Sequence, residues 1–107
     1  LEYEEISDKT VVCAGTVPPR ITAVWKKMPK NLKHIGGWAD FRKSQIKELG
    51  QLQSISGNAI FFGNSQIKEL GQLQSIGGDA YVEENSPLVN LLKSKKIVKG
   101  EIVEIKF

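Results

Sequence analysis

The chain is poor in the residues that carry most protein chemistry. Among its 107 residues there is one cysteine, Cys13, and one histidine, His34. A single cysteine excludes an internal disulfide, and together the two residues cannot supply the usual four-ligand zinc site. No apolar run reaches the length of about 18 residues that a membrane-spanning helix needs. We therefore expect no metal, no cofactor and no contact with a membrane.

Neither of these two residues stands where catalysis is expected. Cys13 lies in the apolar stretch 11–14, which is typical of a buried and inert thiol. His34 occupies the repeat position that Ser54 and Ser75 hold later in the chain, which predicts a turn facing solvent. A nucleophile or general base needs an orienting partner and a cleft, and the sequence indicates neither. We expect a protein that is not an enzyme and has no catalytic residue.

The start of the chain and its lone cysteine bear on its location. No basic, then apolar, then small-residue pattern of a secretory leader opens the sequence. An unpaired cysteine is more typical of a reducing compartment than of an oxidising one. Both features favour the cytoplasm.

Charge is small overall but uneven along the chain. The formal net charge is +3, and the acidic stretch 1–8 is followed by two basic runs, 26–33 and 93–99. Such runs are usually solvated faces, although they can also bind phosphates. Arginine, which dominates specific contacts with nucleic acids, occurs only as Arg20 and Arg42. A nucleic-acid interface is thus an alternative, and it would consist of Lys26, Lys27, Lys30, Lys33, Lys93, Lys95 and Lys96.

An internal repeat dominates the middle of the chain. Residues 44–55 and 65–76 both read Ser-Gln-Ile-Lys-Glu-Leu-Gly-Gln-Leu-Gln-Ser-Ile, without a single change between the two copies. Weaker copies of a second motif follow each other at 35–41, 55–61 and 76–82, with nearly the same spacing. A fixed period of this kind predicts stacked, equivalent structural units, each burying the same positions.

Each unit has two parts with different spacing of apolar residues. The alternation of Ala59 and Phe61 predicts a short strand with one face buried. Ile67, Leu70 and Leu73 then advance in threes, which suits extended or 3₁₀-like turns. Glycine in the middle of this second part argues against an α-helix there. The glycine pairs at 36–37 and 77–78, and the single Gly57 between them, predict tight corners before the strands.

The repeat resembles the short leucine-rich repeats of bacterial and phage proteins. Met28-Pro-Lys-Asn-Leu32-Lys-His-Ile35-Gly-Gly is similar to the Leu-Pro-x-x-Leu-x-x-Val-Gly-Gly phrasing of those repeats, and the resemblance covers residues 21–92. It implies a mainly β fold, a small right-handed solenoid of 20–21-residue coils with caps at both ends. Serine replaces the usual asparagine of the turns, so a different short parallel β-solenoid is the alternative.

The range covered by the resemblance divides the chain into three parts of one domain. Residues 1–20 are expected to form an N-terminal cap, residues 21–92 the repeat region, and residues 93–107 a closing strand or hairpin. Ser86 and Pro87 predict a short helix over 87–95, with Ser86 as its N-cap and leucines along one face.

The strand positions predict the function. If alanine and phenylalanine or valine point inward, their neighbours point outward, and these outward residues differ in every unit. Variety on one face of a repeat protein is typical of a recognition surface for another protein, or for a second copy of the chain. The predicted partner-binding residues are Trp38, Asp40, Arg42, Ile60, Phe62 and Tyr81. Nucleic-acid binding, or a structural repeat segment of a larger bacterial or phage protein, are the alternatives.

Overall fold

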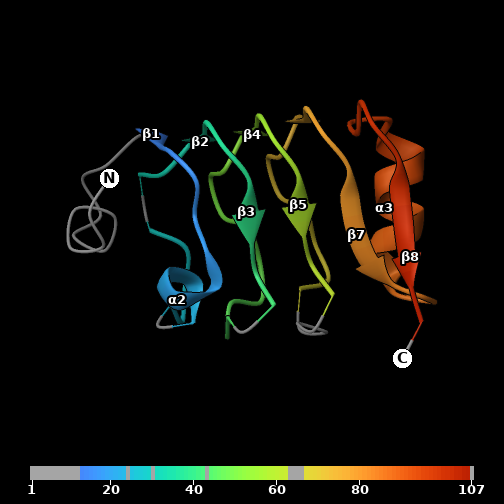
Figure 1. Ribbon diagram of the computed structural model, residues 1–107, viewed down its shortest axis with the longest axis horizontal. Helices are drawn as coiled ribbons and strands as arrows, with labels where there is room; N and C mark the ends of the chain where they lie inside the picture. Colours follow the sequence, from blue (N-terminus) through green and yellow to red (C-terminus); the bar gives the residue numbers. More distant parts are fainter. Residues whose placement is uncertain (1–12, 24, 30, 43, 63–66, 107) are drawn as a thin grey trace.

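Two parallel four-stranded sheets run along the molecule, each built from equivalent segments of successive repeats (Figure 1). The computed structural model describes residues 13–23, 25–29, 31–42, 44–62 and 67–106. Sheet A has the order β1 (Cys13–Ala14), β2 (His34–Ile35), β4 (Ser54–Ile55), β6 (Ser75–Ile76). Sheet B has the order β3 (Ala39–Asp40), β5 (Ala59–Ile60), β7 (Ala80–Glu83), β8 (Ile102–Ile105), and the helices are α2 (Pro19–Thr22) and α3 (Pro87–Lys95).

Each strand pairs with the equivalent segment of the next repeat. In sheet B, Ala39 pairs with Ala59, Ala59 with Ala80, and Ala80 with Ile102. The strands of sheet A that belong to the repeats pair in the same way. Because parallel pairing keeps residues in register, equivalent positions of the repeat stack on one another.

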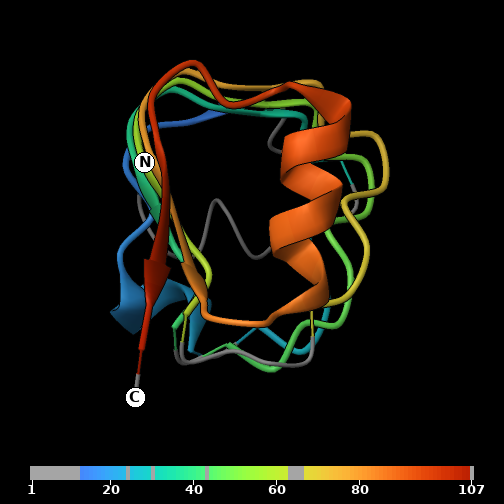
Figure 2. The same cartoon turned by 90° about the vertical axis from the view of Figure 1, so that its right-hand side faces the viewer.

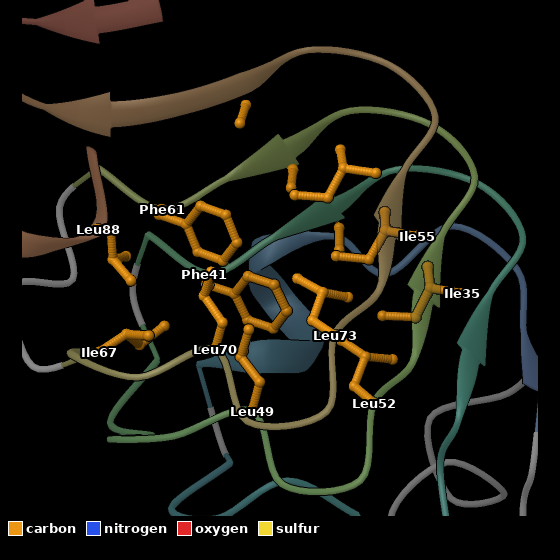
Figure 3. Packing of buried hydrophobic residues seen from close by; sticks show 14 of the residues in the cluster. Ile35, Phe41, Leu49, Leu52, Ile55, Phe61, Ile67, Leu70, Leu73 and Leu88 are labelled. Carbon is orange, nitrogen blue, oxygen red and sulfur yellow. The ribbon is translucent and has the colours of Figure 1, made fainter. Parts of the chain in front are cut away.

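The core consists of these stacked positions. The rings of Phe41 and Phe61 lie parallel, with centroids 5.6 Å apart and planes 6° apart. Figure 3 shows these rings between the strands and the leucines of the opposite wall. The prediction that the Ala59 and Phe61 positions point inward is confirmed, since both are buried. The leucines and isoleucines of the three-residue spacing are buried too, namely Ile46, Leu49, Leu52, Ile67, Leu70 and Leu73.

The wall opposite the strands is made of turns in the two identical repeats. The amide of Leu73 donates to the carbonyl of Leu70 at 3.1 Å, and Glu48 and Glu69 form a parallel bridge. Gly71 has a φ of 57°, a left-handed conformation that favours glycine over residues with a Cβ atom. The prediction of turns rather than an α-helix over 67–76 is confirmed.

In the last unit α3 takes the place of the turns and forms that wall (Figure 2). The predicted helix over 87–95 and its cap are confirmed: the hydroxyl of Ser86 accepts a hydrogen bond from the amide of Leu88. Leu88, Val89 and Leu92 are buried against the core. The helix ends at Lys95, and its C-cap Lys96 is left-handed and donates its amide to the carbonyl of Leu92. No helix in the described ranges is long and apolar enough to cross a membrane.

The predicted fold class is wrong. The chain is a small compact α/β fold with two parallel sheets, not the mainly β, leucine-rich-repeat-like closed solenoid. Among the described residues, six of the eight strands are only two residues long, because corners and turns interrupt the pairing within each unit. Its radius of gyration of 12.4 Å is close to the roughly 13 Å of a globular domain of about 100 residues.

The two ends of the chain bear on the predicted caps. Residues 1–12 of the proposed N-terminal cap lie outside the described residues, and Val17 forms a parallel bridge with Ala39. At the other end β8 pairs in parallel with β7. Val98 adds a further bridge to Ile76 of sheet A. The division into caps and repeat region stays a prediction.

The corner glycines are required because neighbouring units approach closely there. A Cβ atom on Gly77 would overlap the carbonyl oxygen of Ser56 in the preceding unit, and one on Gly57 would lie 2.9 Å from the carbonyl oxygen of Gly37. By contrast, a Cβ atom on Gly15 would have no atom within 4 Å.

We expect Gly77→Ala to lower the free energy of unfolding by about 1–3 kcal/mol, because backbone must shift to admit the methyl group. Gly15→Ala is the matched control and should change stability by no more than about 0.5 kcal/mol. Urea unfolding followed by circular dichroism measures both. Equal stabilities of the two variants would contradict the close packing of the corners.

Candidate functional site

The outer face of sheet B carries a column of apolar side chains. Ile60 of β5 pairs with Tyr81 of β7, which pairs with Val103 of β8. Their neighbours Ala59 and Ala80 are buried, and successive side chains of a strand point to opposite faces. Ile60, Tyr81 and Val103 therefore lie together on the outside, and each is partly exposed.

A second group extends this column along the strands. Phe62 is partly exposed, and the guanidinium carbon of Arg42 lies 5.6 Å from the centre of its ring, within cation–π range. Ile105 is also partly exposed. It pairs with Glu83, two residues further along the strands than the pair of Val103 and Tyr81. We name the apolar surface formed by Ile60, Phe62, Tyr81, Val103 and Ile105 the strand face.

The strand β8 contributes to this surface, although its residues were not among the predicted partner-binding residues. The alternation of apolar and charged residues in 97–107 predicted a closing strand or hairpin but not its partner. Only the parallel pairing of β8 with β7 places Val103 and Ile105 beside Tyr81. A signal was present, because this segment has the same alternation as the strands of the repeats.

Asp40 is buried, so the prediction that it lies on the exposed surface is wrong. Its side chain is 1% exposed and accepts bonds from Arg42: Nε lies 3.0 and 2.9 Å from the two carboxylate oxygens, and Nη2 lies 2.7 Å from Oδ2. The neighbouring segment at Val17 and the helix α2 cover this end of β3. The amide of Asp40 donates to the carbonyl of Val17, and Thr22 Oγ1 donates to the carbonyl of Asp40.

This ion pair fixes the place of Arg42 at the margin of the strand face. The hydrogen bonds to Asp40, and secondarily its negative charge, raise the pKa of Arg42 above its ordinary value. The backbone amide of Arg42 also donates to Asp40 Oδ1 at 3.0 Å. Asp40 is thus a positioning residue for Arg42 rather than a contact residue.

Trp38 lies at the corner before β3 and is the one large hydrophobic side chain that is exposed among the described residues, at 39%. Its carbonyl accepts a bond from the amide of Val17. In the repeat it occupies the position of Asn58 and Asp79. It therefore flanks the strand face instead of standing within it.

A ladder of polar side chains, which the sequence analysis did not anticipate, runs along the same corner. Asn58 Oδ1 accepts a bond from the amide of Asp79 at 2.8 Å, and Asp79 Oδ1 accepts one from the amide of Glu101 at 2.8 Å. Each side chain thus satisfies a backbone amide of the following unit, which holds successive corners at a fixed spacing. The recurrence of asparagine and aspartate at one repeat position was the available signal.

His34 lies in sheet A, not in a solvent-facing turn as predicted. It pairs with Ser54 on one side and Cys13 on the other, is partly buried, and its Nδ1 lies 2.8 Å from Ser54 Oγ. The predicted burial of the Cys13 thiol falls outside the described side chains. Within the described ranges no three histidine, cysteine, aspartate or glutamate side chains gather in a way that would hold a metal ion.

The lysines of the alternative nucleic-acid site are not brought together. Lys26 and Lys27 line a hollow beside Met28 and Pro29, near the first repeat. Lys93 and Lys96 lie on and after α3, at the opposite end of the long axis (Figure 1). Lys33 is partly exposed, Lys95 is exposed, and Lys30 lies outside the described residues.

No protein-family model, curated protein or solved structure matches this chain. The resemblance to leucine-rich repeats therefore stays a prediction.

Removing the guanidinium group of Arg42 should show how much the buried carboxylate of Asp40 depends on it for stability. We expect Arg42→Ala to lower the free energy of unfolding by about 1–3 kcal/mol, because the Asp40 carboxylate loses its charged donor. Asp40→Ala combined with Arg42→Ala should cost less than the sum of the single changes. A double-mutant cycle from urea unfolding measures this coupling, and strictly additive effects would show that the pair contributes nothing.

Proposed function

We propose that this protein is a non-enzymatic interaction module that binds another protein through the strand face. The observation that supports this function is the alignment of Ile60, Tyr81 and Val103 on the outside of a sheet whose inner face forms the core. Contiguous apolar surface on a small protein is typical of an interaction site, and tyrosine and arginine are enriched in the residues that dominate binding energy.

The scaffold suits such a function because the surface is already ordered before binding. The strands beneath the strand face pair on both sides in β5 and β7, and the stacked rings of Phe41 and Phe61 pack behind them. A pre-ordered surface loses little conformational entropy when a partner docks, so more of the contact energy appears as affinity. The cation Arg42 at the margin supplies a polar rim.

Nucleic-acid binding has weaker support. It would require the lysines of 26–33 and 93–99 to act on one ligand, and they lie toward opposite ends of the molecule (Figure 1). Binding that depended on them would fall steeply with salt, since each neutralised phosphate releases counterions. Binding through the strand face should be nearly insensitive to salt.

The first test is the oligomeric state of the wild type and of a Phe62→Asp, Tyr81→Ser double variant. Light scattering coupled to size-exclusion chromatography should show a folded monomer in both cases. Gln72→Ser with Gln74→Asp, at exposed positions of the same repeat, is the matched control. A wild-type dimer that only the Phe62, Tyr81 variant dissociates would assign the strand face to self-association.

With a monomer established, we expect immobilised wild-type protein to retain a specific partner that the Phe62→Asp, Tyr81→Ser variant retains about tenfold less or not at all. The loss follows from removing two aromatic contacts, each worth about 1–2 kcal/mol or more at the centre of an interface. The control variant should retain the partner as the wild type does, at both low and high salt. Equal recovery on all three proteins would contradict the proposed function.

A further inference from the structure

The C-terminal end of the molecule presents an unpaired sheet edge. Sheet B ends at β8, which pairs with β7 on one side and with no strand on the other within the described part of the chain. Figure 2 faces this end, with β8 and α3 as its two nearest elements. The opposite edge of the sheet differs, because Val17 bridges to Ala39 there.

The backbone of β8 leaves hydrogen-bonding groups for an additional strand. The carbonyls of Glu101 and Ile105 accept bonds from the amides of Ala80 and Glu84, both at 2.9 Å. Because the bonds of a parallel ladder alternate along a strand, the N–H and C=O groups of Ile102 and Glu104 point away from β7. These groups are directed at the open edge, where a further strand would pair with them.

This edge carries charged side chains but lacks proline, another common protection against pairing. At four residues β8 is as long as β7 and twice the length of the other strands. The segment 101–106 contains no proline, and Ile102, Val103 and Ile105 are partly exposed. Natural edges are commonly blunted by proline, bulges or a covering element, and an edge without them is a template for another chain. The charged side chains of this segment are Glu101, Glu104 and Lys106.

The surroundings of the edge specify the charge of its ligand. Lys93 and Lys96 line a hollow of about 550 Å³ together with Val98, Gly100 and Ile102, next to the start of β8. Lys93 Nζ lies 3.9 Å from a carboxylate oxygen of Glu104. The segment 93–106, which contains β8 and these lysines, carries five lysines and two glutamates. This excess of positive charge favours an acidic ligand.

We propose that the open edge of β8 binds an extended, acidic segment of a partner polypeptide, which adds to sheet B as a fifth strand. Its backbone bonds to the outward groups of Ile102 and Glu104, and its carboxylates lie near Lys93 and Lys96. This mode combines sequence-independent main-chain bonds with side-chain selection by charge. The open edge shares β8 with the strand face, but it binds through backbone groups and nearby lysines rather than through Ile60, Phe62 and Tyr81, so either proposal can fail while the other stands.

The test uses a fluorescein-labelled peptide, Glu-Val-Glu-Ile-Glu-Val-Glu, titrated into the full chain and followed by fluorescence anisotropy. Glu104→Pro removes the outward N–H and keeps every bond to β7, and prolines are tolerated at such edge positions. Glu104→Ala removes the same carboxylate but keeps the N–H, so it is the matched control. We expect the peptide to bind the wild type and Glu104→Ala similarly, and Glu104→Pro at least about tenfold more weakly.

Charge gives a second, independent measurement. The peptide with lysine in place of glutamate should bind the wild type at least about tenfold more weakly than the acidic peptide does. The acidic peptide should likewise bind a Lys93→Glu, Lys96→Glu variant at least about tenfold more weakly than it binds the wild type. These comparisons decide the question even if Glu104→Pro does not fold. Equal binding of the two peptides, or equal binding by Glu104→Pro and Glu104→Ala, overturns the proposal. A wild-type dimer that Glu104→Pro alone dissociates also overturns it, because the edge would then belong to a second copy.

Discussion

Parallel pairing between equivalent positions of successive units is the constraint on which the rest of this structure depends. It places Ala39, Ala59 and Ala80 side by side on the inner face of sheet B. Further along the strands, the same register brings the rings of Phe41 and Phe61 into a parallel stack 5.6 Å apart. A substitution in one unit therefore alters the packing of the next, because each buried side chain contacts the side chain at the equivalent position of the neighbouring unit.

The same register also determines what a corner can contain. Where two units meet, the carbonyl of Ser56 lies so close to Gly77 that a methyl group would overlap it. The side chains of Asn58 and Asp79 use this proximity, since each reaches the backbone amide of the following unit at 2.8 Å. Close packing and polar satisfaction at the corners are therefore two results of one spacing, and together they give a pre-ordered outer surface.

The two proposed surfaces follow from how the stack is built and how it ends. On the outer face of sheet B, register converts isolated apolar residues into the continuous strand face. At the C-terminal end, β8 continues sheet B as if it were one more repeat strand and leaves its own far edge unpaired among the described residues. The helix α3 supplies lysines beside that edge, including Lys93, which lies 3.9 Å from Glu104. One surface selects by apolar contact and the other by backbone pairing and charge.

The sequence by itself determined the local features of the protein. The repeat period, the inward positions of Ala59 and Phe61, and the helix capped by Ser86 were all predictable, because each depends on spacing or on neighbours within a short stretch of chain. Only the tertiary structure decided the fold class, the burial of Asp40 and the place of His34 in a sheet. Asp40 alternates correctly for an outward residue, yet its side chain is buried and its backbone bonds to the distant residues Val17 and Thr22. The partner of β8 was equally hidden from the sequence. Pairing and burial of this kind arise between segments far apart in the chain. The spacing of residues within one segment does not indicate which other segment it pairs with.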